Sequence, residues 1–161
     1  MAAIDTPLLI VGHGPGALVA AKLASGIGQS SVVVGHEPIE EGERVVLDDA
    51  SVAFLEPDGV LGVLRPYAAD QDPFAIAPGT FEAGLKHHCV VDMLVTVFDG
   101  LWVEDLALTG PRAGARLTDG RSNWAITADA YLDVSDYPTD LNAAIHRAAA
   151  FVNEHFGVTH G

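Results

Sequence analysis

Two short apolar runs near the start of the chain predict a pair of buried strands. Residues 8–11 are all apolar and lead into the glycine-rich segment 12–17, and the second run occupies 31–34. Uninterrupted apolar runs of this length are typical of strands that are buried on both faces. Good helix formers fill 18–24 between them, and glycines end that stretch. The pattern predicts a strand, a tight turn, a helix and a second strand, as a right-handed parallel crossover requires.

The middle of the chain gives shorter patterns. Three apolar stretches, 45–47, 51–55 and 60–64, are interpreted as short strands. The last two flank Glu56-Pro57-Asp58-Gly59, in which each residue favours a turn. A loop rich in proline and aspartate is expected over 65–77.

The second half of the chain is predicted to contain a short helix, a meander of strands and a closing helix. The short helix starts near Thr80, where apolar residues recur at helical spacing. Asp99-Gly100 and Asp119-Gly120 are dipeptides typical of two-residue hairpin turns. The strands are expected at 90–98, 101–108, 115–117, 124–126 and 128–134. The closing helix, 139–156, buries a stripe made of Leu141, Ile145, Ala148 and Val152.

The length and composition fit one globular domain. The chain has 161 residues, of which 49% are hydrophobic and 19% are charged, and no linker divides it. We therefore expect a single α/β domain over 1–161. It should be a Rossmann-like, three-layer domain with a parallel sheet of about four strands, a β-meander crossover and an inserted β-hairpin.

The charge balance narrows the classes of partner. Acidic residues outnumber basic ones by 22 to 8, for a formal net charge of −14. Such a surface repels phosphate backbones and anionic lipids, so neither a nucleic acid nor a membrane is expected as a partner. The first residues lack the basic region and long apolar run of a signal peptide or membrane anchor. The single cysteine, Cys89, excludes an internal disulfide, and a cytoplasmic location is expected.

The glycine-rich segment matches a dinucleotide-binding turn. It has the spacing Gly-x-Gly-x-x-Ala directly after a predicted strand and before a predicted helix. Gly12 permits the tight turn, Gly14 lets a pyrophosphate approach the backbone, and Ala17 lets helix and strand pack closely. The helix amides and dipole then favour the phosphates. The candidate cofactor-binding residues in this turn are Gly12, His13, Gly14, Pro15, Gly16 and Ala17.

A carboxylate follows the second predicted strand. There Glu37 can accept hydrogen bonds from both ribose hydroxyls of an adenosine, and it would repel a 2′-phosphate. NADP is therefore disfavoured, whereas FAD and NAD both remain compatible with these residues. A second interpretation stays open, in which the glycines only form the turn of a parallel sheet and Glu37 belongs to a generally acidic surface.

With these motifs in this order, the sequence resembles the nucleotide-binding domain of the glutathione-reductase-like and aromatic-hydroxylase-like FAD oxidoreductases. Gly12, Gly14, Ala17 and Glu37 match the part of that motif that holds the adenosine and the pyrophosphate. The likeness extends to Thr118-Asp119-Gly120-Arg121 in the meander and to 127–132 before the last strand. The resemblance implies FAD binding through the ADP part.

The chain also departs from that family. The last predicted strand ends in Asp133-Val134-Ser135-Asp136, where the family has a turn that approaches the flavin. The sequence has no redox-active cysteine pair and no evident nucleophile with its base, so no catalytic residue is assigned. Two functions remain. One is an FAD-binding subunit of an oxidoreductase assembly, completed by a larger subunit or by a second copy of the chain. The other is a non-catalytic structural or regulatory subunit that docks a redox partner.

Several other residues have side chains that could bind a metal ion, stack with a ring or bind a phosphate. The run His87-His88-Cys89 is interpreted as a helix end rather than a metal site, because neighbouring side chains point in different directions. Trp102 and Trp124, on predicted meander strands, are interpreted as packing residues. Basic residues are scarce, and any one of Arg44, Arg65 and Arg121 could meet a phosphate.

Overall fold

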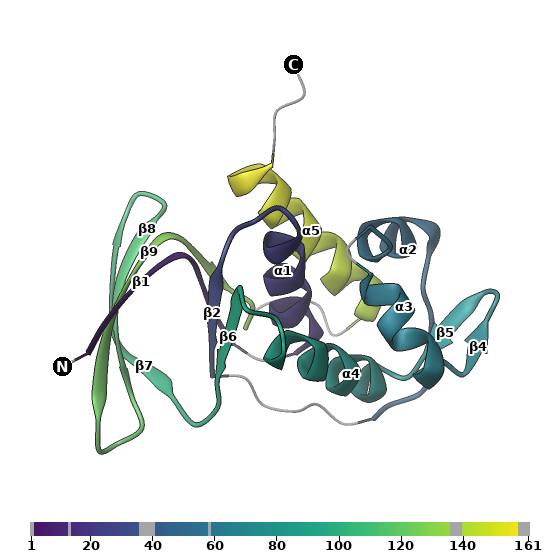
Figure 1. Cartoon of the computed structure of the whole chain (residues 1–161), viewed down its shortest axis with the longest axis horizontal. Helices are drawn as coiled ribbons and strands as arrows, with labels where there is room; N and C mark the ends of the chain where they lie inside the picture. The colour runs from purple at the N-terminus through teal and green to yellow at the C-terminus, as the bar shows by residue number, and fades with distance from the viewer. Residues whose placement is uncertain (1, 13, 36–40, 58, 136–139, 158–161) are drawn as a thin grey trace.

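The computed structural model describes residues 2–12, 14–35, 41–57, 59–135 and 140–157 (Figure 1). Its main sheet has six strands in the order β6-β2-β1-β9-β8-β7. The strands are β1 (Ala2–Val11), β2 (Ser31–Val34), β6 (Val95–Phe98), β7 (Trp102–Thr109), β8 (Arg112–Thr118) and β9 (Asn123–Asp133). The first four strands in that order are parallel, and β7, β8 and β9 form an antiparallel meander.

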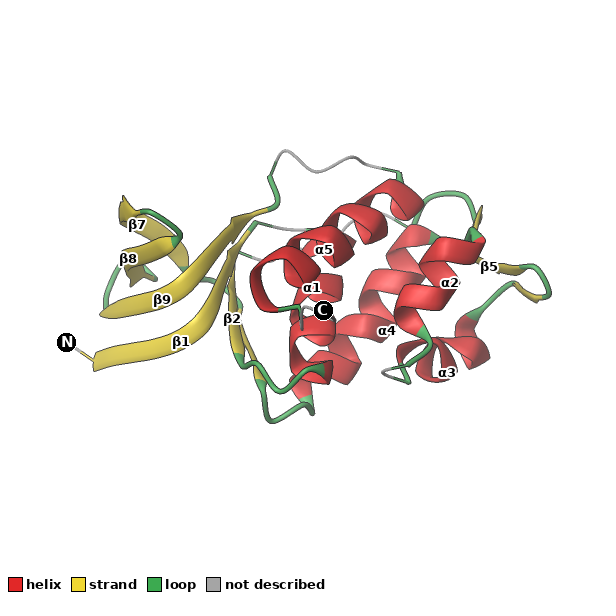
Figure 2. Ribbon diagram, turned by 90° about the horizontal axis from the view of Figure 1, so that it is seen from above, coloured by secondary structure: helices red, strands yellow, loops and turns green. Residues whose placement is uncertain are grey.

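The helices lie together on one side of the parallel strands, and the meander lies on the other side (Figure 2). The helices are α1 (Pro15–Gly26), α2 (Asp49–Leu55), α3 (Val60–Leu64), the short 3₁₀ helix η1 (Arg65–Tyr67), α4 (Pro78–Val90) and α5 (Leu141–Phe156). A small antiparallel sheet is formed by β3 (Val45–Val46), β4 (Asp70–Gln71) and β5 (Phe74–Ile76). This arrangement confirms the predicted Rossmann-like α/β class with a parallel sheet and a meander.

The apolar runs of β1 and β2 are buried on both faces of the sheet, as the sequence predicts. On β1, Leu8 and Ile10 belong to the core beneath the helices, whereas Leu9 belongs to a second core beneath the meander. On β2, Val33 joins the first core, and its two neighbours join the second. The helix α1 is buried along almost its whole length, because α4 and α5 pack against it. The start of α1 is therefore fixed relative to the end of β1.

The stretches 51–55 and 60–64 are helices, so their prediction as strands was wrong. Asp48 caps α2 by accepting a hydrogen bond from the amide of Ser51 at 2.8 Å. Ser51 and Leu55, four residues apart, are buried, which is the spacing of a helix face. In α3, Val60 and Leu64 are buried at the same spacing. Both segments are short, and an apolar run of five residues does not distinguish a buried helix from a strand.

Only the last part of the predicted strand 90–98 is a strand. Its one partner in the sheet is β2, which pairs with it from Ser31 opposite Val95 to Val34 opposite Phe98. Because β2 has four residues, nothing is available to pair with 90–94. Val90 instead ends α4, which confirms a helix in the region predicted to start near Thr80.

The two predicted hairpin turns have different outcomes. Asp119-Gly120 does join two paired strands, β8 and β9, with Thr118 opposite Asn123. Asp99-Gly100 does not form a hairpin, because β6 and β7 lie at opposite edges of the six-stranded sheet. The stretches predicted as strands 124–126 and 128–134 form one long strand, β9.

The predicted inserted β-hairpin is present in the structure. It lies within 65–77, predicted as a loop, where β4 and β5 pair and β3 adds to β5. The closing helix α5 buries all four residues of its predicted stripe. Within the described ranges, no helix combines the length and the apolar character needed to cross a membrane.

Candidate nucleotide-binding site

The predicted dinucleotide turn lies at the carboxyl edge of the parallel sheet. β1 ends at Val11, and α1 begins at Pro15, with Gly14 as its N-cap residue. β1 lies between β2 and β9, so the strand order reverses direction beside it. Open α/β sheets bind ligands in the crevice outside the carboxyl ends of their strands at such a reversal. The sequence therefore places its glycines at the position where this fold class holds ligands.

Gly12 is required by packing within the protein. Its φ is +122°, and a Cβ atom there would lie 2.7 Å from Cγ2 of Val134 and 3.2 Å from the amide nitrogen of Ser135. The amide of Gly12 donates to the carbonyl oxygen of Val34 at 3.1 Å, which ties the turn to the end of β2. The close approach of β9 to the turn thus explains Gly12 without a ligand.

Gly14 lies in a different environment. Its φ is +106°, a conformation that L side chains rarely adopt, and among the described residues no atom lies within 4 Å of the position a Cβ would occupy, although Gly14 itself is buried. As N-cap it has no side chain to accept hydrogen bonds from the first-turn amides of α1. The start of α1 therefore has no side-chain cap, and the described residues leave the Cβ position of Gly14 unfilled, as close approach of a phosphate to the backbone would require.

The other residues of the turn support this arrangement. Pro15 is in the first turn of α1, where the missing amide hydrogen costs nothing. Gly16 and Ala17 are buried within α1, and Ala17 is fully enclosed in the helix-side core. The small side chain of Ala17 allows the helix to lie close to the sheet, as its place in the motif predicts.

Two of the predicted cofactor-binding residues lie outside the described residues. These are His13, between the two glycines, and Glu37, two positions after Gly35. Gly35 itself has a φ of +75°, and its Cβ position is 3.9 Å from the amide nitrogen of Gly12. The ends of β1 and β2 are therefore adjacent, and the role of Glu37 at the ribose stays a prediction.

A carboxylate that sequence reasoning did not select also lies at this edge. Asp133 is the last residue of β9, pairs in register with Val11 and is exposed. One of its oxygens accepts a hydrogen bond from the amide of Ser135 at 2.9 Å. Among the described residues 11–12, 14–17, 34–35 and 133–135, none is basic. A phosphate at this edge would therefore depend on backbone amides and on the dipole of α1.

A second polar group, also missed from the sequence, lies toward the other end of α1. Asp92 accepts hydrogen bonds from Nζ of Lys22 at 2.6 Å, from Oγ of Ser25 at 2.7 Å and from the amide of Leu94 at 2.9 Å. Burial alone would raise the pKa of Asp92, but these hydrogen bonds outweigh it and hold that pKa at about 2. Lys22 and Asp92 are 70 positions apart, so only the spacing of Lys22 and Ser25 on one helix face hinted at the group.

The run His87-His88-Cys89 lies near the end of α4. Cys89 is fully buried, its Sγ lies 3.9 Å from the carbonyl oxygen of Leu18, and burial raises the pKa of its thiol to about 12. Burial also lowers the pKa of His88. Across the part of the chain that the structure describes, no three His, Cys, Asp or Glu side chains are grouped to hold a metal ion.

Comparison with solved structures identifies the fold. The flavin-dependent monooxygenase PieE, solved with FAD and substrate, matches with a TM-score of 0.67 at 17% identity over 80% of this chain. The p-nitrophenol 4-monooxygenase PnpA from Pseudomonas putida matches with a TM-score of 0.64 at 16% identity over 83% of it. The anhydrotetracycline hydroxylase OxyS from Streptomyces rimosus gives 0.63 at 14% identity. The chain shares the fold of flavin-dependent monooxygenases.

The similarity to these structures covers only part of their length and is not accompanied by a sequence match. The chain spans 30% of the length of PieE and 41% of that of PnpA, so most of each monooxygenase has no counterpart in these 161 residues. No family model matches the sequence, and no curated protein matches it closely. At such low identity the comparison establishes the fold alone. A function must therefore be argued from the residues of the glycine turn.

Proposed function

We propose that this chain binds FAD and holds the ADP part of the cofactor on the turn formed by residues 12–17. The observation that carries the proposal is the turn at Gly14, where the start of α1 has no side-chain cap and no described atom lies within 4 Å of the Cβ position, at the reversal of strand order. In this assignment the amides at the start of α1 bind the pyrophosphate, Ala17 lets the helix approach, and Glu37 accepts hydrogen bonds from the ribose. Proteins that share the fold are named as flavin-dependent monooxygenases, which favours FAD over other dinucleotides.

The proposed cofactor supplies redox chemistry when it is bound, and this chain supplies its binding and orientation. The fold neighbours are more than twice as long as this chain, so a polypeptide outside these residues would cover the flavin. We propose that a larger oxidoreductase subunit or a second copy of the chain provides that cover. NAD remains the alternative cofactor, and the carboxylate of Glu37 disfavours NADP because it would repel a 2′-phosphate.

The test begins with the small molecule that the purified protein releases on denaturation. Its absorbance spectrum and mass should be those of oxidised FAD. If the protein is purified without ligand, thermal unfolding should be followed with FAD, NAD, NADP and ADP at equal concentration. Since a ligand that binds only the folded state must stabilise it, FAD and ADP should both raise Tm, and NADP should raise it least. A protein that releases no nucleotide and is stabilised by none of the four would contradict the proposal.

A second function is favoured by the environment of Gly12. Because its contacts with Val134 and Ser135 already require glycine, part of the motif can be maintained by packing alone. In this alternative the chain is a structural or regulatory subunit whose acidic surface docks a basic redox partner. Affinity purification from the native source distinguishes the two: a larger oxidoreductase subunit should accompany a chain whose nucleotide turn stays empty.

A further inference from the structure

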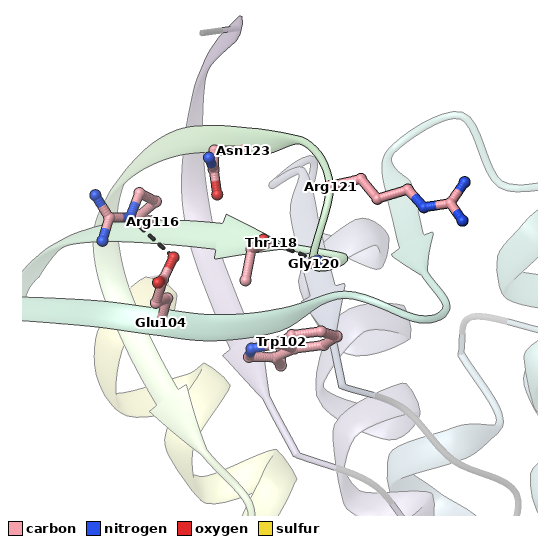
Figure 3. Close-up of a pocket in the computed structure, with 7 residues that line it drawn as sticks. All are labelled: Trp102, Glu104, Arg116, Thr118, Gly120, Arg121 and Asn123. Carbon is pink, nitrogen blue, oxygen red and sulfur yellow. Dashed lines mark hydrogen bonds and ion pairs between the residues drawn. The ribbon is translucent and has the colours of Figure 1, made fainter.

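A groove on the meander has features of a ligand site and lies apart from the residues of the glycine turn (Figure 3). It has a volume of about 420 Å³. It is lined by the first residues of β7, the last residues of β8, the turn between β8 and β9, and the first residue of β9. Trp102, Thr118 and Asn123 lie in register across the three strands, so their side chains share one face of the sheet.

Trp102 gives the groove an aromatic surface. The side chain was expected to be a packing residue, but the residue is 51% exposed. The indole lies beside the turn between β8 and β9, since its Cη2 is 3.6 Å from the position that a Cβ atom would take at Gly120. The other tryptophan, Trp124, is half-buried against the core beneath the meander. A half-exposed indole that lines a groove can stack with a flat ring.

Arg121 gives the groove an unengaged positive charge. The amide of Arg121 donates to Oδ1 of Asp119 at 2.8 Å, so the turn fixes its backbone. Among the lysines and arginines that the structure describes, only the side chain of Arg121 has no hydrogen bond, ion pair or ring contact. Those of the others have partners, as in Lys22–Asp92, Arg44–Asp70, Arg65–Gln71, Lys86–Asp99, Arg112–Asp129 and Arg116–Glu104, and Arg147 also takes part in an interaction. In a chain with 22 acidic residues, an arginine without a carboxylate partner is unusual.

Two other polar side chains of the groove, Thr118 and Arg116, already have partners within the protein. The hydroxyl of Thr118 donates to the carbonyl oxygen of Ser122 and accepts from the amide of Gly120. Arg116 is neutralised by Glu104 at 3.1 Å and by Asp105 at 2.6 Å. In Figure 3 the side chain of Arg121 extends away from the Arg116–Glu104 pair, with Thr118 and Gly120 between them and Trp102 below them in this view. The groove therefore has a neutralised end and a positive end.

We infer that this groove binds a flat aromatic molecule that carries an anionic group. The ring stacks on the indole of Trp102, and the anion meets the guanidinium of Arg121. Both an aromatic carboxylate and the phosphate of a purine nucleotide have this chemistry. The site is separate from the one proposed at Gly14, and its occupation requires neither FAD nor the glycine turn.

The experiment follows the indole N–H signals of the ¹⁵N-labelled full chain by NMR. With two tryptophans the spectrum has two such signals, and a Trp124→Phe variant assigns the one from Trp102. The probes are 2-naphthoate against neutral 2-naphthamide, and AMP against adenosine. Arg121→Gln tests the charge, Trp102→Leu tests the ring by amide shifts of residues 118–123, and Arg112→Gln is the control on the same meander. A Gly14→Ala background separates this site from the glycine turn.

We expect saturable movement of the Trp102 signal with an anionic probe and about tenfold weaker binding by Arg121→Gln, because one charge-assisted hydrogen bond is lost. Arg112→Gln should bind as the wild type does. Movement with 2-naphthoate alone assigns an aromatic acid, and movement with AMP alone assigns a nucleotide. The inference is overturned if neither anion moves the signal, if the neutral probes bind as tightly, or if Arg121→Gln has no effect.

Discussion

The start of α1 and the face near its end differ in how their polar groups are satisfied. Lys22 and Ser25 both donate to Asp92, and the backbone beyond the helix is held by hydrogen bonds such as Gly28 to Ser25 at 2.9 Å. At the start, Gly14 offers no side-chain cap, and no described atom lies within 4 Å of its Cβ position. A buried polar group without a partner is costly, so most such groups in proteins have one. The hydrogen bonds of Asp92 therefore serve the stability of the fold, whereas the Gly14 end is where we propose that the ligand binds.

The largest loss of stability is expected when Asp92, the hydrogen-bond partner of Lys22 and Ser25, is removed. Asp92→Ala leaves the ammonium of Lys22, 7% exposed, without its carboxylate, and should lower the free energy of unfolding by about 3–5 kcal/mol. Urea unfolding followed by circular dichroism measures the change. Asp99→Ala removes the exposed partner of Lys86 and should cost less than about 1 kcal/mol. Equal losses in the two variants would show that the Asp92 group is no more than a surface ion pair.

The next effect concerns Gly12, the part of the turn that packs against β9. Gly12→Ala forces a Cβ atom against Val134 at a positive φ and should cost about 2–3 kcal/mol. Gly110→Ala has a φ of +62° but no atom within 4 Å, so it measures the cost of the backbone alone, about 1 kcal/mol. In a Val134→Ala background, the cost of Gly12→Ala should fall toward that of Gly110→Ala. If the cost of Gly12→Ala stays the same in that background, contact with Val134 is not what requires glycine at position 12.

A smaller effect is expected from pH. The pKa of Asp92 is about 2 in the fold and 3.8 ordinarily, so the unfolded chain binds the proton first as the pH falls. The stability from Asp92 is therefore complete above about pH 4 and is lost as the pH falls toward 2. Urea midpoints from pH 6 to 2.5 should decline less steeply in Asp92→Asn. Some slope will remain, because hydrogen bonds also lower the pKa values of Asp48 and Asp119. An unchanged slope would contradict the assignment.

The parts of the fold predicted from the sequence are those with local signals. The apolar runs of β1 and β2 and the glycines between them identify the parallel crossover, since each signal spans only a few residues. The stripe of α5 repeats over about three turns and is equally local. The glycine spacing also predicted the place of the candidate site at the carboxyl edge of the sheet.

The parts that were missed depend on partners far away in the sequence. The length of β6 is limited by the four residues of β2, and nothing in 90–94 reveals that limit. Asp99-Gly100 favours a turn in either case, and only the pairing of β7 with β8 shows that the chain crosses to the other edge of the sheet. Asp48, which caps α2, is also held by a residue far away in the sequence. Its backbone amide donates a hydrogen bond to Oδ1 of Asn142 in α5 at 2.9 Å.

The most direct measurement of the central claim is isothermal titration of FAD and ADP into the wild-type chain and into Gly14→Ala. The substitution meets no atom of the described residues within 4 Å, so we expect its cost to stability to be the strain of a positive φ, about 1–3 kcal/mol. Its side chain would nevertheless occupy the space where a phosphate approaches the backbone. We predict saturable binding of FAD and of ADP to the wild type and at least tenfold weaker binding of both to folded Gly14→Ala. Absence of binding to the wild type, or equal binding by the two proteins, would contradict the account.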